Sequence, residues 1–187
     1  MKATAKATRA LPMMTAIVAL GLSATSIAHA GAKKHAGMPV AKAALLAGDG
    51  SAKGEAKVVE TPKGLEVMIH VTGLPAGTHA AHIHTTGACT APDFTSAGGH
   101  WNPTKHQHGK DNPQGMHMGD MPNIVLNEKG EGHLKFTIPG GKLTGGDTPL
   151  LDTDGAAVVI HAAADDMKTD PTGNAGGRLA CGVLTAA

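Results

Sequence analysis

Aromatic side chains are almost absent from this sequence. Its 187 residues include one tryptophan, two phenylalanines and no tyrosine, and no block of basic residues occurs in a chain whose formal net charge is +1. Nucleic-acid-binding proteins present a basic surface, and those that bind single strands add aromatic side chains on which bases stack. The two absences argue against a nucleic-acid partner.

A long apolar run is also lacking near the N-terminus, where the apolar stretch 13–27 is shorter than the ~20 residues that span a bilayer. This stretch follows Pro12 and three basic residues, and it ends at Ala28-His29-Ala30. That order is typical of a secretory signal peptide rather than of a membrane anchor. The sequence therefore predicts a periplasmic protein without a membrane anchor, which begins at Gly31 after cleavage.

The chain length fits one ordinary domain and leaves too little for two. We expect a cleaved signal peptide at 1–30, a short N-terminal segment at 31–39 and a single domain at 40–187. The sequence does not indicate the oligomeric state, for which a homodimer is the candidate.

Cysteine is scarce, with only Cys89 and Cys181. In the oxidising compartment that an exported protein reaches, two cysteines favour one disulfide over two free thiols. The alternative is metal ligation by cysteine, for which the sequence lacks a C-x-x-C pair. A disulfide would close a loop of more than ninety residues, worth ~4–5 kcal/mol in the loop-entropy model.

Glycine, by contrast, is abundant, at 26 residues, which is roughly twice its average share of about 7%. Glycines between short apolar runs favour turns and argue against a coiled coil or a helix bundle. Run 41–47 fits helix or strand by propensity, but its exit into Gly48-Asp49-Gly50 favours a strand. The expected strands are 41–47, 55–61, 65–72, 124–126, 133–138, 158–161 and 179–184.

Two turn signals lie between neighbouring strands and predict hairpins. They are Pro62-Lys63-Gly64 and Asn127-Glu128-Lys129-Gly130, and the second would join 124–126 to 133–138. Segment 85–122 has no periodicity, and so long an irregular segment in a compact domain is usually functional or disordered. The pattern predicts an all-β antiparallel sandwich or barrel that carries long loops.

The sequence contains 12 histidines, most of them in the middle of the chain, and this abundance indicates a functional role. His82 and His84 flank Ile83 at the end of a strand-like stretch, so their imidazoles share one face of the strand. Further imidazole and carboxylate groups follow: His100, His106, His108, His117, Asp120 and His161. These groups suit zinc or copper, and there are more of them than one tetrahedral ion can use. The sequence therefore predicts two metal ions.

Four segments combine these histidines with neighbouring residues: 79–84 (HAAHIH), 96–103 (SAGGHWNP), 117–120 (HMGD) and 173–182 (GNAGGRLACG). They resemble, in order and spacing, the copper/zinc superoxide dismutase family, and the resemblance covers roughly residues 40–187. The signal-like start makes the chain similar to an exported bacterial-type member. The resemblance implies an eight-stranded Greek-key β-barrel, an Ig-like sandwich, with long metal-binding and electrostatic loops.

The resemblance also implies which residues bind each metal. The implied copper ligands are His82, His84, His100 and His161, and the implied zinc ligands are His100, His108, His117 and Asp120. His100 matches a histidine that bridges the two ions, whereas His106 is interpreted as an ordinary loop residue. Asp165 matches a carboxylate that hydrogen-bonds one ligand of each metal, and Cys89 and Cys181 match the intrasubunit disulfide of the family.

The implied activity is dismutation of superoxide to dioxygen and hydrogen peroxide, by a copper ion that alternates between +2 and +1 beside a structural zinc. Arg178 matches the arginine that attracts and orients the superoxide anion next to copper, and His100 matches the residue that delivers a proton. Lys168 and Thr172 are the candidates for steering the anion. Their loop departs from better-known members because Pro171 precedes Thr172.

A periplasmic copper/zinc carrier or buffer on the same fold is the alternative function. A carrier needs metal ligands but not the Arg178 motif, so the presence of both favours an enzyme. Four further histidines match no ligand of the family and are interpreted as ordinary strand or surface residues: His35, His70, His79 and His133.

Overall fold

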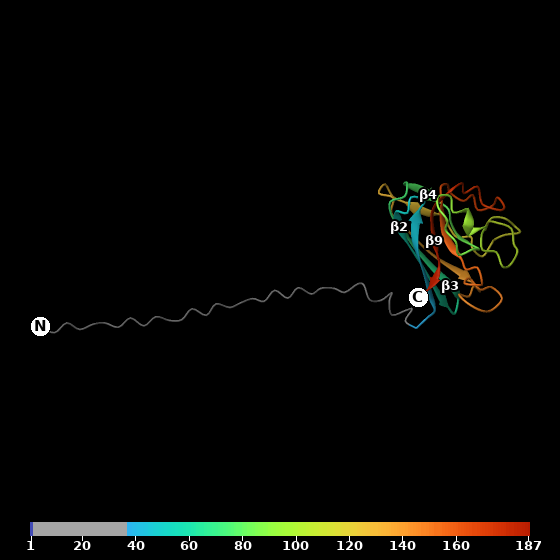
Figure 1. Ribbon diagram of the computed structural model, residues 1–187, viewed down its shortest axis with the longest axis horizontal. Coiled ribbons are helices and arrows are strands. Elements are labelled where there is room, and N and C mark those ends of the chain that lie inside the picture. The colour runs from blue at the N-terminus through green and yellow to red at the C-terminus, as the bar shows by residue number, and fades with distance from the viewer. Residues whose placement is uncertain (2–36) are drawn as a thin grey trace. The chain divides into compact units, whose positions relative to one another are not determined.

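The computed structural model describes Met1 and residues 37–187, and the regular secondary structure within them is almost entirely β-strand, joined by long loops (Figure 1). A single 3-10 turn, Thr95–Ala97, is the helical element of these residues, and none of their helices is long enough to cross a membrane. Apart from Met1, the predicted signal peptide 1–30 and residues 31–36 lie outside the described residues. The strands are β1 (Val40–Ala47), β2 (Ala52–Thr61), β3 (Gly64–Val71), β4 (Gly77–His79), β5 (Ala81–His84), β6 (Ile124–Leu126), β7 (Gly132–Pro139), β8 (Ala157–His161), β9 (Arg178–Val183) and β10 (Thr185–Ala186).

The strands form an antiparallel barrel of Greek-key topology. Strands β5, β8, β9, β1, β2, β3 and β7 are hydrogen-bonded in that order, β10 pairs with β1, and β4 pairs with β6. Only Ala80 separates β4 from β5, so the two act as one interrupted strand. With β4 and β5 counted as one strand, the order is β6, β4/β5, β8, β9, β1, β2, β3 and β7. The two end strands, β6 and β7, are consecutive in the sequence. The predicted eight-stranded barrel is confirmed.

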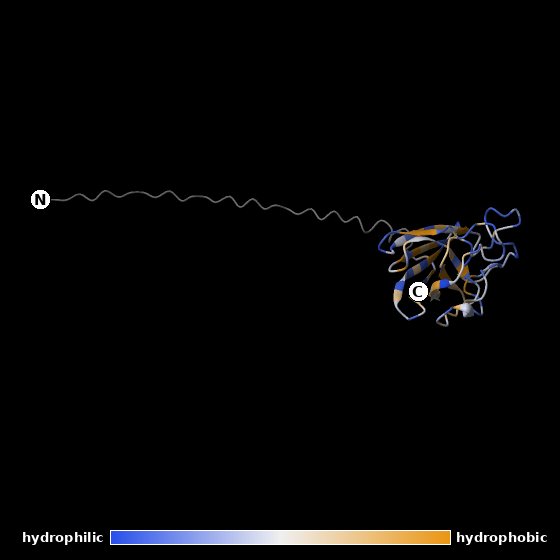
Figure 2. Ribbon diagram, turned by 90° about the horizontal axis from the view of Figure 1, so that it is seen from above, coloured by the Kyte–Doolittle hydropathy of each residue, from blue (hydrophilic) through white to orange (hydrophobic). Residues whose placement is uncertain are grey.

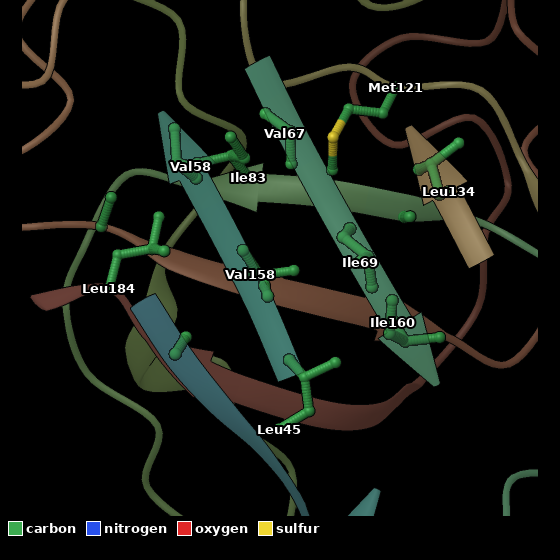
Figure 3. Close-up of a cluster of buried hydrophobic side chains, with 14 of the residues drawn as sticks. Leu45, Val58, Val67, Ile69, Ile83, Met121, Leu134, Val158, Ile160 and Leu184 are labelled. Carbon is green, nitrogen blue, oxygen red and sulfur yellow. The ribbon is translucent and has the colours of Figure 1, made fainter. Parts of the chain in front are cut away.

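Aliphatic side chains fill the barrel interior, in keeping with the shortage of aromatic residues. Val67 and Ile69 of β3 are at most 2% exposed, which confirms the predicted alternation along this strand. They belong to one cluster with Val158 and Ile160 of β8 (Figure 3). Orange apolar bands accordingly mark the strands, where they alternate with polar residues, and many of the loops are blue or white (Figure 2). This core holds β5 and β8, which carry three of the predicted metal ligands.

The first predicted hairpin is confirmed. Strands β2 and β3 pair in register from Gly54 opposite Val71 to Thr61 opposite Gly64. Gly64 has φ +118°, and a Cβ at this position would collide with the carbonyl oxygen of Ile138 on β7. The turn therefore requires glycine both for its backbone conformation and for the close approach of the third strand.

The second predicted hairpin is wrong in its strand pairing, although its turn forms. The Gly130 N–H donates to the Asn127 carbonyl at 2.8 Å, and the Asn127 N–H donates to the Glu131 carbonyl at 3.0 Å. Beyond the turn, β7 pairs with β3 over eight residue positions, whereas the three-residue β6 pairs with β4. The eight-residue strand β7 finds a partner of equal length in β3 and so joins the large sheet, whereas the short β6 pairs with the equally short β4.

The irregular segment between β5 and β6 is tied to the barrel by the disulfide Cys89–Cys181, which confirms the predicted pairing. Cys181 lies on β9 and is 1% exposed. It belongs to a second, small apolar cluster that includes Phe94 and Ala97 of the segment and Val159 of β8. The start of the long loop is therefore fixed against two central strands.

Removing this disulfide should destabilise the fold. The double substitution Cys89→Ala/Cys181→Ala is expected to lower the free energy of unfolding by ~3–5 kcal/mol, because the bond closes a loop with a sequence separation of 92 residues. Urea denaturation of the oxidised protein and of the variant measures the difference. Two alkylatable thiols in the native oxidised protein, or equal unfolding midpoints, would contradict the assignment.

Candidate metal centre

Eight polar side chains are buried together beneath the loops, each at most 8% exposed. Two come from β5, one from the end of β8, four from the segment between β5 and β6, and one from the loop between β8 and β9. In that order they are His82 and His84; His161; His100, His108, His117 and Asp120; and Asp165. The structure therefore brings together all seven predicted ligands and the predicted supporting carboxylate.

The pairing of β5 with β8 aims three of these imidazoles at one place. On β5, His82 and His84 lie on one face and Ile83 lies on the other, where it is fully buried in the core. On β8 the register shifts between Ile160 and His161, and His161 then pairs with Arg178 of β9. Such an irregularity redirects a side chain at the end of a strand. It places His161 beside the two histidines of β5, with its ring centroid 4.9 Å from that of His82.

The ligand atoms fall into two overlapping groups, within each of which the atoms lie at most 4.8 Å apart. The first group is His82, His84, His100 and His161, and the second is His82, His100, His108 and Asp120. His117 adjoins the second group, because its Nδ1 lies 3.2 Å from Asp120 Oδ1 and 3.3 Å from His100 Nδ1. His100 belongs to both groups, and its Nδ1 faces Asp120 and His117.

The carboxylate of Asp165 links the two groups from outside. Its Oδ2 accepts a hydrogen bond from His82 Nε2 at 2.8 Å, and its Oδ1 accepts one from His108 Nε2 at 2.9 Å. Both Nε2 atoms therefore carry the ring proton, which leaves the Nδ1 lone pairs of the two rings for a metal. This is the arrangement that the family resemblance implied for Asp165.

Backbone carbonyl groups hold two more rings in the same way. The Nδ1 of His84 donates to the Gly98 carbonyl at 2.9 Å, and the Nδ1 of His161 donates to the Gly176 carbonyl at 3.3 Å. The proton of each ring is therefore on Nδ1, and each Nε2 presents a lone pair. These two Nε2 atoms lie only 3.3 Å apart. Their lone pairs repel one another because neither nitrogen carries a proton, and a cation bound by both would remove this repulsion.

The nitrogen atoms that face inward support the fit to metal ions. His82 Nδ1 and His100 Nε2 are buried and make no hydrogen bond to the described residues. Buried polar atoms without a partner are costly, and a bound cation would satisfy both. Four nitrogens suit copper, and nitrogens with one carboxylate oxygen suit a tetrahedral zinc. The residues present therefore fit both ions.

The charge states at the centre favour metal binding as well. Burial lowers the pKa of His84 to about 2, that of His161 to about 3 and that of His100 to about 4, so the three rings are neutral at physiological pH. Burial alone would raise the pKa of Asp120, but hydrogen bonds from the surrounding histidines hold it well below the usual range. Neutral imidazoles beside an ionised carboxylate are the forms that bind metal ions.

His108 differs from the other rings because two carboxylates flank it. Burial works against its protonated form, but hydrogen bonds to Asp120 and Asp165 raise its pKa to about 9. In the metal-free protein, a proton on His108 therefore balances part of the negative charge of the two carboxylates. Binding a divalent ion at its Nδ1 would replace that proton, so we expect metal uptake here to release a proton.

Arg178 opens β9 and is held at the edge of the centre. Its Nη1 donates to the Phe94 carbonyl at 2.5 Å and its Nη2 to the Gly98 carbonyl at 2.7 Å. The Gly98 carbonyl also accepts the hydrogen bond from His84, so one backbone oxygen positions both side chains. Although burial lowers the pKa of Arg178, a guanidinium remains charged in proteins.

A cavity of about 590 Å³ leads to the histidines. Its lining includes His84, His100, His161, Thr172 and Arg178. The positive charge of Arg178 therefore faces the same cavity as three imidazoles of the first group. A fixed positive charge beside the cavity is what an anion-binding subsite requires.

The remaining predicted residues lie in different places. Thr172 lines the cavity, whereas Lys168 is exposed on the same loop and is not among the lining residues. His106 is also exposed, and its Nδ1 contacts the Met116 carbonyl at 3.2 Å outside both ligand groups. The choice of His108 over His106 agrees with this geometry.

Two supporting residues were missed by sequence reasoning. Asn123 holds the backbone of Asp165, because its Nδ2 donates to the Asp165 carbonyl at 2.9 Å and its Oδ1 accepts the Asp165 N–H at 2.8 Å. Asp170 accepts the backbone N–H of His108 at 2.5 Å and lies 3.8 Å from His117 Nε2. Both act across 42 residues or more of sequence, and no local pattern marks such partners.

The fold and the site define a class: an antiparallel Greek-key barrel with two adjoining metal-binding groups that share His82 and His100. A family model described as copper/zinc superoxide dismutase (SODC) matches residues 52–184. The chain belongs to the copper/zinc superoxide dismutase family.

Curated relatives and solved structures agree with this membership. Superoxide dismutase (Cu-Zn) 2 of Aquifex aeolicus is 43% identical over 146 residues, which cover 77% of this chain and 85% of that protein. Superoxide dismutase (Cu-Zn) of Caulobacter vibrioides is 43% identical over 147 residues, which cover 77% and 84%. The crystal structure of a SOD-like protein from Bacillus subtilis is similar with a TM-score of 0.73 and 38% identity, covering 77% of this chain and 97% of that one.

The hydrogen bond between Asp165 and His108 leaves room only for glycine at position 173. Gly173 has φ +63°, and a Cβ there would collide with Asp165 Oδ1 and lie 2.5 Å from His108 Nε2. Gly173→Ala is therefore expected to lower metal affinity at least tenfold. Competition with a chromophoric chelator measures that affinity.

Gly177→Ala is the matched control, because a Cβ at Gly177 would meet no atom within 4 Å. This variant should bind metal as the unsubstituted protein does. Equal metal affinity in the two variants would show that the contact between Asp165 and His108 does not matter.

Proposed function

We propose that this protein catalyses the dismutation of superoxide, in which two superoxide ions and two protons give dioxygen and hydrogen peroxide. The observation that carries the proposal is the sharing of one carbonyl, that of Gly98, by His84 of the ligand group and by the guanidinium of Arg178. Bound copper supplies the electron acceptor and donor by alternating between the +2 and +1 states. The protein supplies the anion subsite, the proton and the fixed geometry.

The proposed copper ligands are His82, His84, His100 and His161, and the proposed zinc ligands are His100, His108, His117 and Asp120. The distances alone also admit His82 to the zinc group. However, Asp165 occupies His82 Nε2, so this ring has a single nitrogen to offer, and the copper group needs it. His117 Nδ1, at 3.2 Å from Asp120 Oδ1, completes the zinc group instead.

Arg178 is proposed as the residue that binds superoxide. Its two hydrogen bonds to backbone carbonyls fix the guanidinium beside the cavity, so little side-chain freedom is lost when an anion binds. Its positive charge also raises the encounter rate with an anion. Thr172 lines the same cavity, and exposed Lys168 would add attraction from the loop. A metal carrier has no need for such a subsite, which favours turnover over storage.

His100 is proposed as the proton carrier. It belongs to both ligand groups, it lines the cavity, and its Nε2 has no protein partner among the described residues. Asp120 Oδ1 meets its Nδ1 at 2.9 Å and so fixes the orientation of the ring. A proton taken up at Nε2 would therefore face the cavity in which peroxide forms.

We infer that this chain is exported, because a disulfide occurs together with a signal-like start. The disulfide Cys89–Cys181 is typical of an oxidising compartment. The proposed location is the periplasm, which rests on the order of residues in 1–30. The other sequence-based expectations stay predictions: no nucleic-acid partner, no membrane anchor and a homodimer as the candidate assembly.

Zinc content should depend on His108 and not on His106. His108→Ala removes a buried ring that contacts both Asp120 and Asp165, so zinc per chain should fall strongly. His106→Ala removes an exposed ring outside the ligand groups and should leave one zinc per chain. Metal analysis of the two purified variants measures this difference, and the reverse pattern would overturn the zinc assignment.

Superoxide consumption should depend on Arg178 at constant metal content. Arg178→Ile is expected to keep one copper and one zinc per chain while activity falls at least tenfold, because the anion loses both charge and orientation. Arg178→Lys should lie between, since it keeps the charge but loses the planar fork.

Lys129→Ile serves as the control for these variants, because it removes one positive charge from the exposed turn before β7. Its activity should equal that of the unsubstituted protein. Full activity of Arg178→Ile with both metals bound would refute the proposed role of Arg178.

A further inference from the structure

Two histidines outside the metal centre, His70 of β3 and His133 of β7, form a pair that the sequence does not reveal. They are 63 positions apart in the chain but lie directly opposite one another in the antiparallel register. Their rings stack with centroids 4.3 Å apart and an interplanar angle of 4°. The interpretation of each as an ordinary strand or surface residue therefore misses their proximity.

A carboxylate extends this pair into a row across three strands. Glu55 of β2 lies opposite His70, so Glu55, His70 and His133 share one face of the sheet. This is the outward face, because Ile69 and Leu134 on the opposite face belong to the core. Glu55 and His133 are exposed and His70 is half-buried, so an ion from solvent can reach all three.

The row borders a surface hollow of about 430 Å³. Met68, Lys57 and Lys135, which form the next row of the same face, complete its wall. Lys135 makes an ion pair with Glu66 at 3.1 Å, which offsets part of its repulsion toward a cation. Two imidazoles, a carboxylate and space for water are thus available at one place.

We propose that Glu55, His70 and His133 form an exchangeable surface site for a borderline divalent cation, with Cu²⁺ bound most tightly. Imidazole nitrogens together with a carboxylate oxygen are a copper(II) donor set, and Cu²⁺ leads the affinity order of first-row divalent metals. Two ligand nitrogens on one ion lie about 3 Å apart, given metal–nitrogen distances near 2.0–2.1 Å. The donor atoms of Glu55, His70 and His133 are not all within 4.8 Å of one another, so binding an ion requires these side chains to rotate. Direct cross-strand neighbours, whose Cβ atoms lie about 4.5–5.5 Å apart, are close enough for such a rotation to bring two imidazoles to one ion.

This site is separate from the buried centre and does not rest on the proposed function. Its three residues belong to β2, β3 and β7, whereas the strand-borne ligands of the centre belong to β5 and β8, toward the other end of the sheet order. The site is exposed, so its ion should exchange rapidly and coordinate water. Binding there should leave superoxide consumption unchanged.

The test is a titration with Cu²⁺ of protein that already holds one copper and one zinc per chain. Equilibrium dialysis should show one further copper equivalent, and electron paramagnetic resonance should show coupling of that copper to two imidazole nitrogens. His70→Gln and His133→Gln should each weaken this binding at least tenfold, and Glu55→Gln should weaken it severalfold. The superoxide consumption of all three variants should be unchanged, which also verifies their fold.

His106→Gln is the matched control, because it removes one exposed histidine elsewhere and should retain the additional copper. Retention of that copper by the double variant His70→Gln/His133→Gln would overturn the proposal. Equal binding by all variants would overturn it as well, since single histidines would then account for the uptake. Unchanged affinity in Glu55→Gln would contradict the three-residue site.

Discussion

The shared carboxylate of Asp165 is the contact on which the metal centre depends. Its two oxygens accept hydrogen bonds from His82 of the proposed copper ligands and from His108 of the proposed zinc ligands, and so fix the tautomer and direction of both rings. Asn123 holds the backbone of Asp165 in turn, and Gly173 leaves the space in which the carboxylate lies. A substitution at any of these positions should therefore disturb both sets of metal ligands, because the Asp165 side chain orients a ring in each.

The barrel supplies the rigidity that this contact needs. Strands β5 and β8 are packed on an aliphatic core, and the disulfide fixes the beginning of the long loop against β8 and β9. The loop can then return four ligands to the strands, although the short 3-10 turn Thr95–Ala97 is its only helix. The Gly98 carbonyl connects the loop to two strands, since it accepts hydrogen bonds from His84 of β5 and from Arg178 of β9. Metal ligation and anion binding are thereby held in one geometry.

Much of this architecture was predictable from the sequence because its signals are local. Alternation marked β3, a Pro-Lys-Gly turn marked its hairpin with β2, and motif spacing marked the buried histidines. Features that depend on distant partners were not predictable. The pairing of β6 with β4, the support of Asp165 by Asn123, and the juxtaposition of His70 with His133 all arise from the barrel topology. Strand patterns report which face is buried, but they do not identify the neighbouring strand.

The central claim is that two adjoining sites, linked through Asp165 and His100, turn over superoxide at the copper side. The most direct test measures copper and zinc per chain and superoxide consumption on the same samples of the oxidised protein, prepared with graded copper loading. After exchangeable surface copper has been removed with a chelator, the account predicts one zinc and up to one copper per chain, with activity proportional to that copper. Full loading of both metals without superoxide consumption would contradict it, as would activity that does not change with copper content.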